Sequence, residues 1–145
     1  MSAEVERLLG GPPAGLVAPE GLVVVQADCP DGAAGVLERA REVLRPIVDA
    51  PRPWPSTDEW RGLLPRWFVD ACSDDERVTT CVLDRWSLRA WVWWFQPDQR
   101  RWLWWDAAAE GTLLTIRLVP TGQGSLLLGT LDWLLKAAGA SPRPR

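Results

Sequence analysis

The sequence predicts an α+β domain in which a small, mostly antiparallel sheet packs with four or five short helices. Three kinds of pattern support this fold class. Short β-branched runs between turn residues indicate strands. Apolar residues spaced three and four apart indicate amphipathic helices between those strands. Two apolar runs on either side of Glu110 and Gly111 indicate a hairpin near residues 101–119.

Length and composition set the limits of the domain. The chain has 145 residues, which fits a single domain with a core of its own. We expect a flexible or short-helical leader at 1–15, the α+β domain at 16–140 and a disordered tail at 141–145. Every basic residue except Lys136 is an arginine, a bias typical of bacteria with high-GC genomes.

The first strand and the first long helix are predicted from residues 21–48. The run GLVVVQ (21–26) is β-branched and bounded by turn residues, which is typical of a buried strand. Asp31 is positioned to cap a following helix that runs to about Leu44, and Pro46 ends or kinks that helix. Its apolar stripe consists of Val36, Leu37, Ala40, Val43, Leu44 and Ile47.

A proline-rich connector (49–55) leads to the clearest helix start in the chain. Ser56 and Glu59 have the spacing of a capping box. Pro65 interrupts the hydrogen-bond ladder, so we expect a kink or two abutting short helices. The core stripe of this segment consists of Trp60, Leu63, Leu64, Trp67, Phe68 and Ala71. Residues 78–84 fit a helix or a strand, and the sequence leaves that choice open.

A short helix over residues 88–95 is predicted from its first residues. Ser87 is an N-cap residue, and Trp86 and Trp91 on either side of it have the spacing of a hydrophobic staple. Pro97 closes the helix. We therefore assign this half of the tryptophan-rich stretch to a helix and the half that follows to the hairpin.

The hairpin prediction includes a register, which a two-residue loop at Glu110–Gly111 fixes. One face then carries the pairs Trp105–Ile116 and Leu103–Leu118, and the other carries Trp102–Val119, Trp104–Arg117 and Asp106–Thr115. We expect the first face to meet the helices. The second face either meets another layer or is exposed.

The last helix is predicted over residues 125–138. Gly139 is a good residue to terminate it, and Lys136 suits its last turn. Its core stripe consists of Leu127, Leu128, Leu131, Leu134 and Leu135. The preceding PTGQGS loop (120–125) lacks the lysine and the spacing of a phosphate loop, so we interpret it as a plain turn.

The sequence indicates no reaction. Histidine and tyrosine are absent, which removes the commonest general base and a common proton donor. The patterns of a phosphate loop, a dinucleotide-binding fold, a nucleophile elbow and a zinc protease are also missing. The sequence therefore favours a protein without enzyme activity, metal or cofactor, and leaves a divergent enzyme open.

The cysteines do not change this interpretation. Cys29, Cys72 and Cys81 are an odd number in a chain without an export signal, so we expect them to be reduced. Cys29 falls between a strand and a helix, where the helix dipole lowers a thiol pKa. Asp28 and Asp31 oppose that effect, because neighbouring negative charge disfavours the thiolate. We interpret Cys29 as a small buried hydrophobe.

The 11 tryptophans carry the main functional signal. Trp60, Trp67, Trp91, Trp105 and Trp133 are interpreted as core residues. Trp102 and Trp104 are predicted to share the second hairpin face with Arg117 and Asp106, and these four are the candidate binding residues. Tryptophan is enriched at protein interfaces because it supplies a large contact area with few rotamers.

Two functions are therefore expected. The first is a non-enzymatic cytosolic protein that binds another protein, as adaptors, inhibitors and immunity proteins do. The alternative is a small-molecule-binding protein or divergent enzyme whose pocket combines indoles with polar groups from Asp28, Cys29, Asp106 or Arg117. A net charge of −3 does not suit nucleic-acid binding, and the apolar runs are too short to cross a membrane. No signal-peptide pattern is present, so we expect a cytoplasmic location.

Overall fold

The computed structural model describes residues 2–73, 85–122 and 126–145. In chain order the elements are α1 (Ala3–Gly10), β1 (Val23–Asp28), α2 (Ala33–Val48), α3 (Thr57–Leu63), α4 (Arg66–Ala71), α5 (Leu88–Trp93), β2 (Trp102–Glu110), β3 (Leu113–Pro120), α6 (Gly129–Ala137) and β4 (Ser141–Pro142). This is the α+β fold that the sequence predicts, with one antiparallel sheet and six short helices in the described residues. The predicted hairpin is present as β2 and β3.

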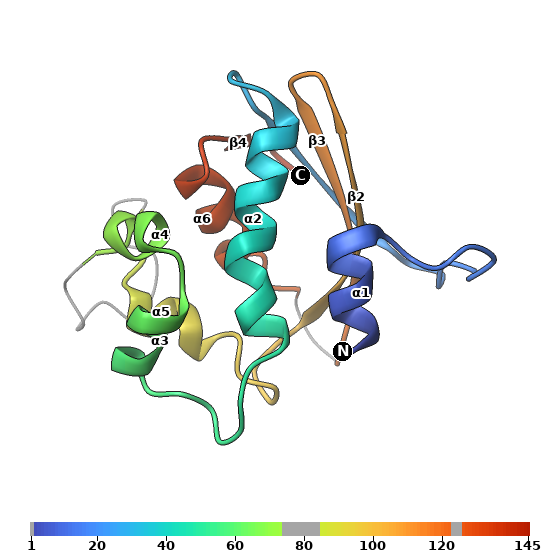
Figure 1. The fold of residues 1–145 in the computed structure, drawn as a ribbon. Helices are drawn as coiled ribbons and strands as arrows, with labels where there is room; N and C mark the ends of the chain where they lie inside the picture. The colour runs from blue at the N-terminus through green and yellow to red at the C-terminus, as the bar shows by residue number, and fades with distance from the viewer. Residues whose placement is uncertain (1, 74–84, 123–125) are drawn as a thin grey trace.

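The sheet has the order β2-β3-β1-β4, and its strands pair antiparallel. Helix α2 lies in front of the sheet, with α6 beside it and with α3, α4 and α5 on the side of α2 away from β2 and β3 (Figure 1). The inward residues of β1 and β3 join the buried residues of these helices in one core. These inward residues are Val25, Ala27, Leu114, Ile116 and Leu118.

The hairpin register differs from the prediction. The turn is at Gly111 and Thr112, because Glu110 pairs with Leu113. This turn shifts the register by two residues from the prediction, and a β-bulge between Trp104 and Asp106 shifts it back by one. As a result Trp104 pairs with Leu118, Asp106 with Arg117 and Leu103 with Val119. The bulge inserts one extra residue into β2, and a simple alternating pattern cannot predict that.

The helix starts are confirmed where a side chain caps them. Ser56 and Glu59 form the predicted capping box, and the N–H of Ala90 donates to Oγ of Ser87 at 3.2 Å. The predicted break at Pro65 separates α3 from α4. The predicted cap at Asp31 is wrong, because Gly32 occupies the N-cap of α2 and no side chain caps it. Helix α2 also continues past Pro46 to Val48.

The C-terminal segment departs from the prediction at its beginning. Helix α6 begins at Gly129, and Leu127, expected in the core stripe, is exposed. Gly139 ends the helix as predicted, with a φ of 101°. Ser141 and Pro142, which the sequence analysis assigns to the tail, form β4 beside Ala27 and Asp28 of β1.

Two further expectations concern residues 78–84 and membrane-spanning helices. The choice between helix and strand for residues 78–84 lies outside the described residues. In the part of the chain that is described, every helix is too short or too polar to cross a lipid bilayer.

Candidate functional site

The four predicted binding residues do not share a face of the hairpin. Trp102 and Trp104 lie in the core, with exposed fractions of 2% and 0%. Arg117 and Asp106 oppose each other on the other face, where Nε of Arg117 donates to Oδ1 of Asp106 at 2.7 Å. The predicted shared face is therefore wrong: Trp102 and Trp104 face the core, and Arg117 and Asp106 form a surface ion pair on the opposite side of the sheet.

The bulge explains how two adjacent tryptophans are both buried. Trp104 faces the core, whereas Trp105 lies outside the main core cluster and is only 6% exposed. The guanidinium of Arg7 in α1 lies over the Trp105 ring, with its central carbon 5.1 Å from the ring centroid. Helix α1 packs along β2 and so covers an indole that the sequence analysis expects among the core residues.

Three indoles pack against phenylalanine rings. A row of ring contacts runs from α4 through α5 to the start of β2, with centroid distances of 4.5–5.9 Å. Its members are Trp67, Phe68, Trp91, Phe95 and Trp102. Aromatic pairs at such distances stabilise a core beyond the area that they bury. These rings therefore have a structural explanation.

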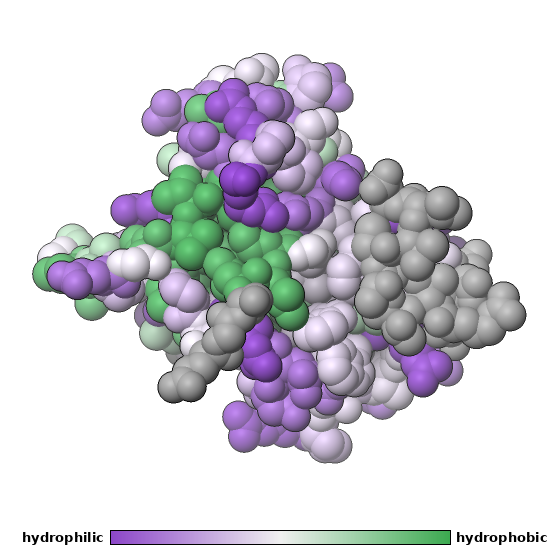
Figure 2. All heavy atoms as spheres, turned by 180° about the vertical axis from the view of Figure 1, so that it is seen from behind, coloured by the Kyte–Doolittle hydropathy of each residue, from purple (hydrophilic) through white to green (hydrophobic). Residues whose placement is uncertain are grey.

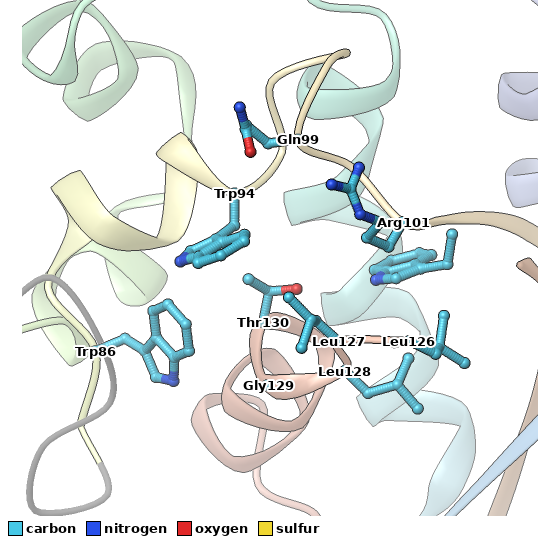
Figure 3. Close-up of a pocket in the computed structure, with 10 residues that line it drawn as sticks. Trp86, Trp94, Gln99, Arg101, Leu126, Leu127, Leu128, Gly129 and Thr130 are labelled. Atoms are coloured by element: carbon cyan, nitrogen blue, oxygen red, sulfur yellow. The ribbon is translucent and has the colours of Figure 1, made fainter. Parts of the chain in front are cut away.

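Three indoles, including that of Trp102 from the same row, line a cavity of about 380 Å³, which we call the tryptophan cavity. They belong to Trp86, Trp94 and Trp102, and the other lining residues are Gln99, Arg101, Leu126, Leu127, Leu128, Gly129 and Thr130 (Figure 3). Trp86 precedes α5, Trp94 follows it, and Trp102 begins β2. The volume is within the range of small-molecule sites.

Neighbouring groups hold the walls of the tryptophan cavity in place. Nε1 of Trp91 donates to the carbonyl oxygen of Thr130 at 2.9 Å and thereby ties α5 to the start of α6. Gly129 lets the Trp86 ring approach closely, since a Cβ at that position would lie 3.0 Å from Cζ2 of Trp86. Trp94 makes an edge contact with Trp93, at a centroid distance of 4.8 Å. The cavity is thus preformed by packed elements.

The polar groups that line the tryptophan cavity are few. They are the Gln99 amide, the Thr130 hydroxyl and the Arg101 guanidinium, and no carboxylate or thiol is among the described lining residues. Nη1 of Arg101 makes a long contact of 3.4 Å with the carbonyl oxygen of Asp98. The site therefore offers planar apolar walls, one cation and two neutral hydrogen-bonding groups.

Sequence reasoning identified only part of this site. Trp102 lines the cavity, whereas Trp104, Arg117 and Asp106 do not. Trp86 was visible as the first residue of a staple, but its partner Gly129 is remote in sequence and was not predicted to meet it. Arg101 carries no local signal, because its position beside the indoles depends on how α5, β2 and α6 pack together.

The polar residues proposed for a pocket in the alternative hypothesis lie elsewhere. Asp28 is paired with Arg143 at the surface, and the hydrogen bond from Arg143 lowers the pKa of Asp28. Cys29 is buried, and both its burial and the charge of Asp28 raise the pKa of its thiol. Burial raises the pKa of Cys72 to about 11. These free thiols are protonated near neutral pH and do not line the tryptophan cavity.

A second hollow of about 610 Å³ lies between the end of α2, the proline-rich connector and β2. It presents one indole, that of Trp54. Its Arg100 is already paired with Glu4 in a largely buried ion pair. The tryptophan cavity is therefore the better candidate for a ligand.

Comparison of the chain with models of protein families, with curated proteins and with solved structures found no match. The function is therefore inferred from the geometry of the described residues.

Proposed function

We propose that the protein is a non-catalytic binding protein that holds a small planar molecule in the tryptophan cavity. The observation that carries this proposal is the convergence on one cavity of Trp86 and Trp94, which flank α5, and Trp102, which begins β2. Indole rings at a cavity wall offer flat faces for a planar ligand. Trp102 also packs against Phe95, so its indole belongs both to the core and to the wall of the tryptophan cavity.

The lack of an acid–base pair supports binding without catalysis. The only hydroxyl among the described lining residues is that of Thr130, and a hydroxyl nucleophile needs a base within hydrogen-bond reach. The lining contains no carboxylate, imidazole or thiol in the part of the chain described. A guanidinium carries hydrogen-bond donors and no acceptor, so Arg101 does not supply a base.

The test compares two tryptophan variants. Trp94→Ala removes a half-buried wall of the tryptophan cavity, and Trp54→Ala removes a half-buried indole from the other hollow. Calorimetric titration with naphthamide should show binding that weakens about tenfold or more in Trp94→Ala and little in Trp54→Ala. A saturated decalin amide should bind more weakly, because it lacks a flat face. If naphthalene derivatives fail to bind at millimolar concentration, the proposal is wrong.

A second candidate function, binding of another protein, is favoured by the outer face of the sheet. Val24 on this face is 49% exposed, and Val119 of β3 lies diagonally across from it. Figure 2 shows a hydrophobic patch on this side of the molecule. Apolar patches of this kind are common at protein interfaces. In this candidate the outer face of the sheet binds the protein partner, in place of the tryptophans that the sequence predicts.

A photo-crosslinking residue tests this second candidate. Placed at Val24 in the native cell, it should give one discrete protein adduct. The same residue at Leu63 of α3, which is 47% exposed, is the matched control and should give none. Equal adduct patterns at Val24 and Leu63 would contradict the binding of a specific protein to the outer face of the sheet. We also propose a cytoplasmic location, which the free thiols of Cys29 and Cys72 support.

A further inference from the structure

The charge of the tryptophan cavity indicates what kind of planar molecule it takes. Arg101 brings a guanidinium to its lining, and no acidic side chain is among the described lining residues. Figure 3 shows Arg101 and Gln99 on one side of the cavity, with Trp94 and Thr130 next to them. The cavity therefore carries a net positive charge next to apolar walls.

Arg101 differs from many other arginines of the chain. Those with a carboxylate partner are Arg41, Arg61, Arg66, Arg100, Arg117, Arg143 and Arg145. Within the described residues, Arg101 has no such partner, and its contact with the Asp98 carbonyl is long. A guanidinium presents a planar fork of donors that matches a carboxylate. Its neighbour Arg100 is paired with Glu4, whereas Arg101 lines the tryptophan cavity without a carboxylate partner among the described residues.

The start of α6 adds to the positive potential. Leu128, Gly129 and Thr130 line the tryptophan cavity and form the N-terminus of this helix. The N-cap residue Leu128 provides no side-chain hydrogen bond to the first turn. Helix N-termini carry a partial positive charge that favours anions. Asp132 in the first turn of α6 opposes this contribution, although it is paired with Arg145, so the charge of the cavity rests mainly on Arg101.

We propose that the ligand of the tryptophan cavity is a small aromatic carboxylate, with its ring against the indoles and its carboxylate on Arg101. This inference rests on the function proposed above and narrows its ligand class. A ligand carboxylate supplies the negative charge that the described lining residues lack. Its ion pair with the Arg101 guanidinium forms beside apolar walls, where charge-assisted hydrogen bonds are strong. A cationic aromatic ligand is disfavoured by repulsion from Arg101.

The test uses three ligands that share one ring system and differ in charge: naphthoate, naphthamide and naphthylmethylammonium. Calorimetric titration of the full chain should rank naphthoate first, about tenfold tighter than naphthamide, with the ammonium compound weakest. Added salt should reduce the preference for naphthoate, because salt screens the charge interaction. This ranking needs no variant and therefore does not depend on how a substitution folds.

Two arginine variants assign the preference to a residue. Arg101→Gln should remove the difference in affinity between naphthoate and naphthamide, because it deletes the charge that distinguishes the two ligands. Arg89→Gln removes the same charge from an exposed position on α5 and should keep the preference. A preference that survives in Arg101→Gln overturns the role of Arg101.

The remaining outcomes separate this inference from the function on which it rests. Equal binding of naphthoate and naphthamide, with both weakened by Trp94→Ala, overturns the carboxylate ligand and leaves the binding function standing. Tightest binding of the ammonium compound also overturns the carboxylate ligand. Failure of all three naphthyl compounds to bind overturns the binding function together with the inference.

Discussion

Trp104 and Trp105 are adjacent residues that are buried against different partners. Trp104 packs in the main core opposite Leu118, whereas Trp105 is covered by α1 and lies under the Arg7 guanidinium. The bulge makes this arrangement possible, because it changes the direction of the side chains along β2. Both indoles therefore contribute to folding, although through different parts of the molecule.

The first prediction concerns the stability of variants at these two positions. Trp104→Ala should lower the free energy of unfolding by about 3–5 kcal/mol, because it deletes a fully buried aromatic ring. Trp105→Ala should have a smaller effect, since it removes packing only against the covering helix. Urea unfolding of the two variants and the wild type measures the difference. A Trp104→Ala variant as stable as the wild type would show that this ring is not part of the core.

The second prediction concerns the thiol of Cys72. Burial raises its pKa to about 11, so iodoacetamide at about pH 8 should alkylate it far more slowly in the folded than in the urea-unfolded protein. The raised folded-state pKa contributes stability below the unfolded-state pKa, and that contribution is lost as the pH rises toward 11. Mass spectrometry of the peptide that contains Cys72 measures the rate. Equal rates in both states would contradict the burial.

At the scale of single residues, the sequence predicts burial well only where the backbone is regular. Trp60 and Trp91 lie on helices whose apolar stripes are continuous, and both are buried as predicted. Trp104 was assigned to the wrong face because a single inserted residue reverses the alternation along a strand. The residues around Trp105 form no pattern that distinguishes a bulged strand from a regular one.

At the scale of elements, α1 replaces a missing strand at the outer edge of β2. The N–H of Trp104 donates to Oε2 of Glu4 at 2.7 Å, and Nε of Arg7 donates to the carbonyl oxygen of Trp104 at 3.1 Å. The same Glu4 carboxylate pairs with Arg100. Two helix side chains thereby satisfy the backbone groups of Trp104 that a neighbouring strand would otherwise bind. Covered edges resist pairing with other chains.

The third prediction follows from this edge contact. Glu4→Ala should lower the free energy of unfolding by about 3 kcal/mol, because it leaves the largely buried Arg100 without its carboxylate partner. It should also increase aggregation on storage, since the edge of β2 loses its cover. Glu6→Ala on the exposed side of the same helix is the control and should behave like the wild type. Unfolding curves and light scattering measure the two effects.

The fourth prediction concerns the contact between α6 and Trp86. In Gly129→Ala the new Cβ would lie 3.0 Å from the indole, so the ring must shift and the tryptophan cavity must change shape. Naphthoate affinity should fall. Gly35→Ala in α2, where an added Cβ meets nothing within 4 Å, should keep the affinity and gain up to about 1 kcal/mol of stability. Unchanged naphthoate binding in Gly129→Ala would contradict a preformed wall.

Elements were predictable where a local signal fixes them. The Ser56 capping box and the Ser87 cap each act within one helical turn, so sequence spacing alone is sufficient. The start of α6 has no side-chain cap and was predicted four residues too early, at residue 125 rather than at Gly129. The walls of the tryptophan cavity depend on contacts between such elements, so the sequence could not assemble them.

At the scale of the whole molecule, the two ends of the chain lie at opposite edges of the sheet. Helix α1 covers the edge strand β2, and β4 forms the other edge beside β1 (Figure 1). The strand order places β3 and β1 inside the sheet, and β3 has the more extensive pairing on its two sides, with β1 and β2. Strand order is a property of long-range packing, and the sequence analysis specified only the hairpin. We therefore expect the sheet to be most stable at β3, which pairs with a strand on each side and packs its inward residues in the core.

The last prediction is a gradient of hydrogen exchange across this sheet. Amides of β3 should exchange slowest, because its inward residues Leu114, Ile116 and Leu118 are fully buried and both of its neighbours must separate before it opens. The Ser141 amide of β4 should exchange much faster, since only two residues pair there, Pro142 has no amide hydrogen, and one side of the strand has no partner in the described sheet. Exchange followed by NMR in the folded protein measures both. Equal protection of β3 and β4 would mean that the sheet opens as one unit, and the stabilising role of the central strand would then be wrong.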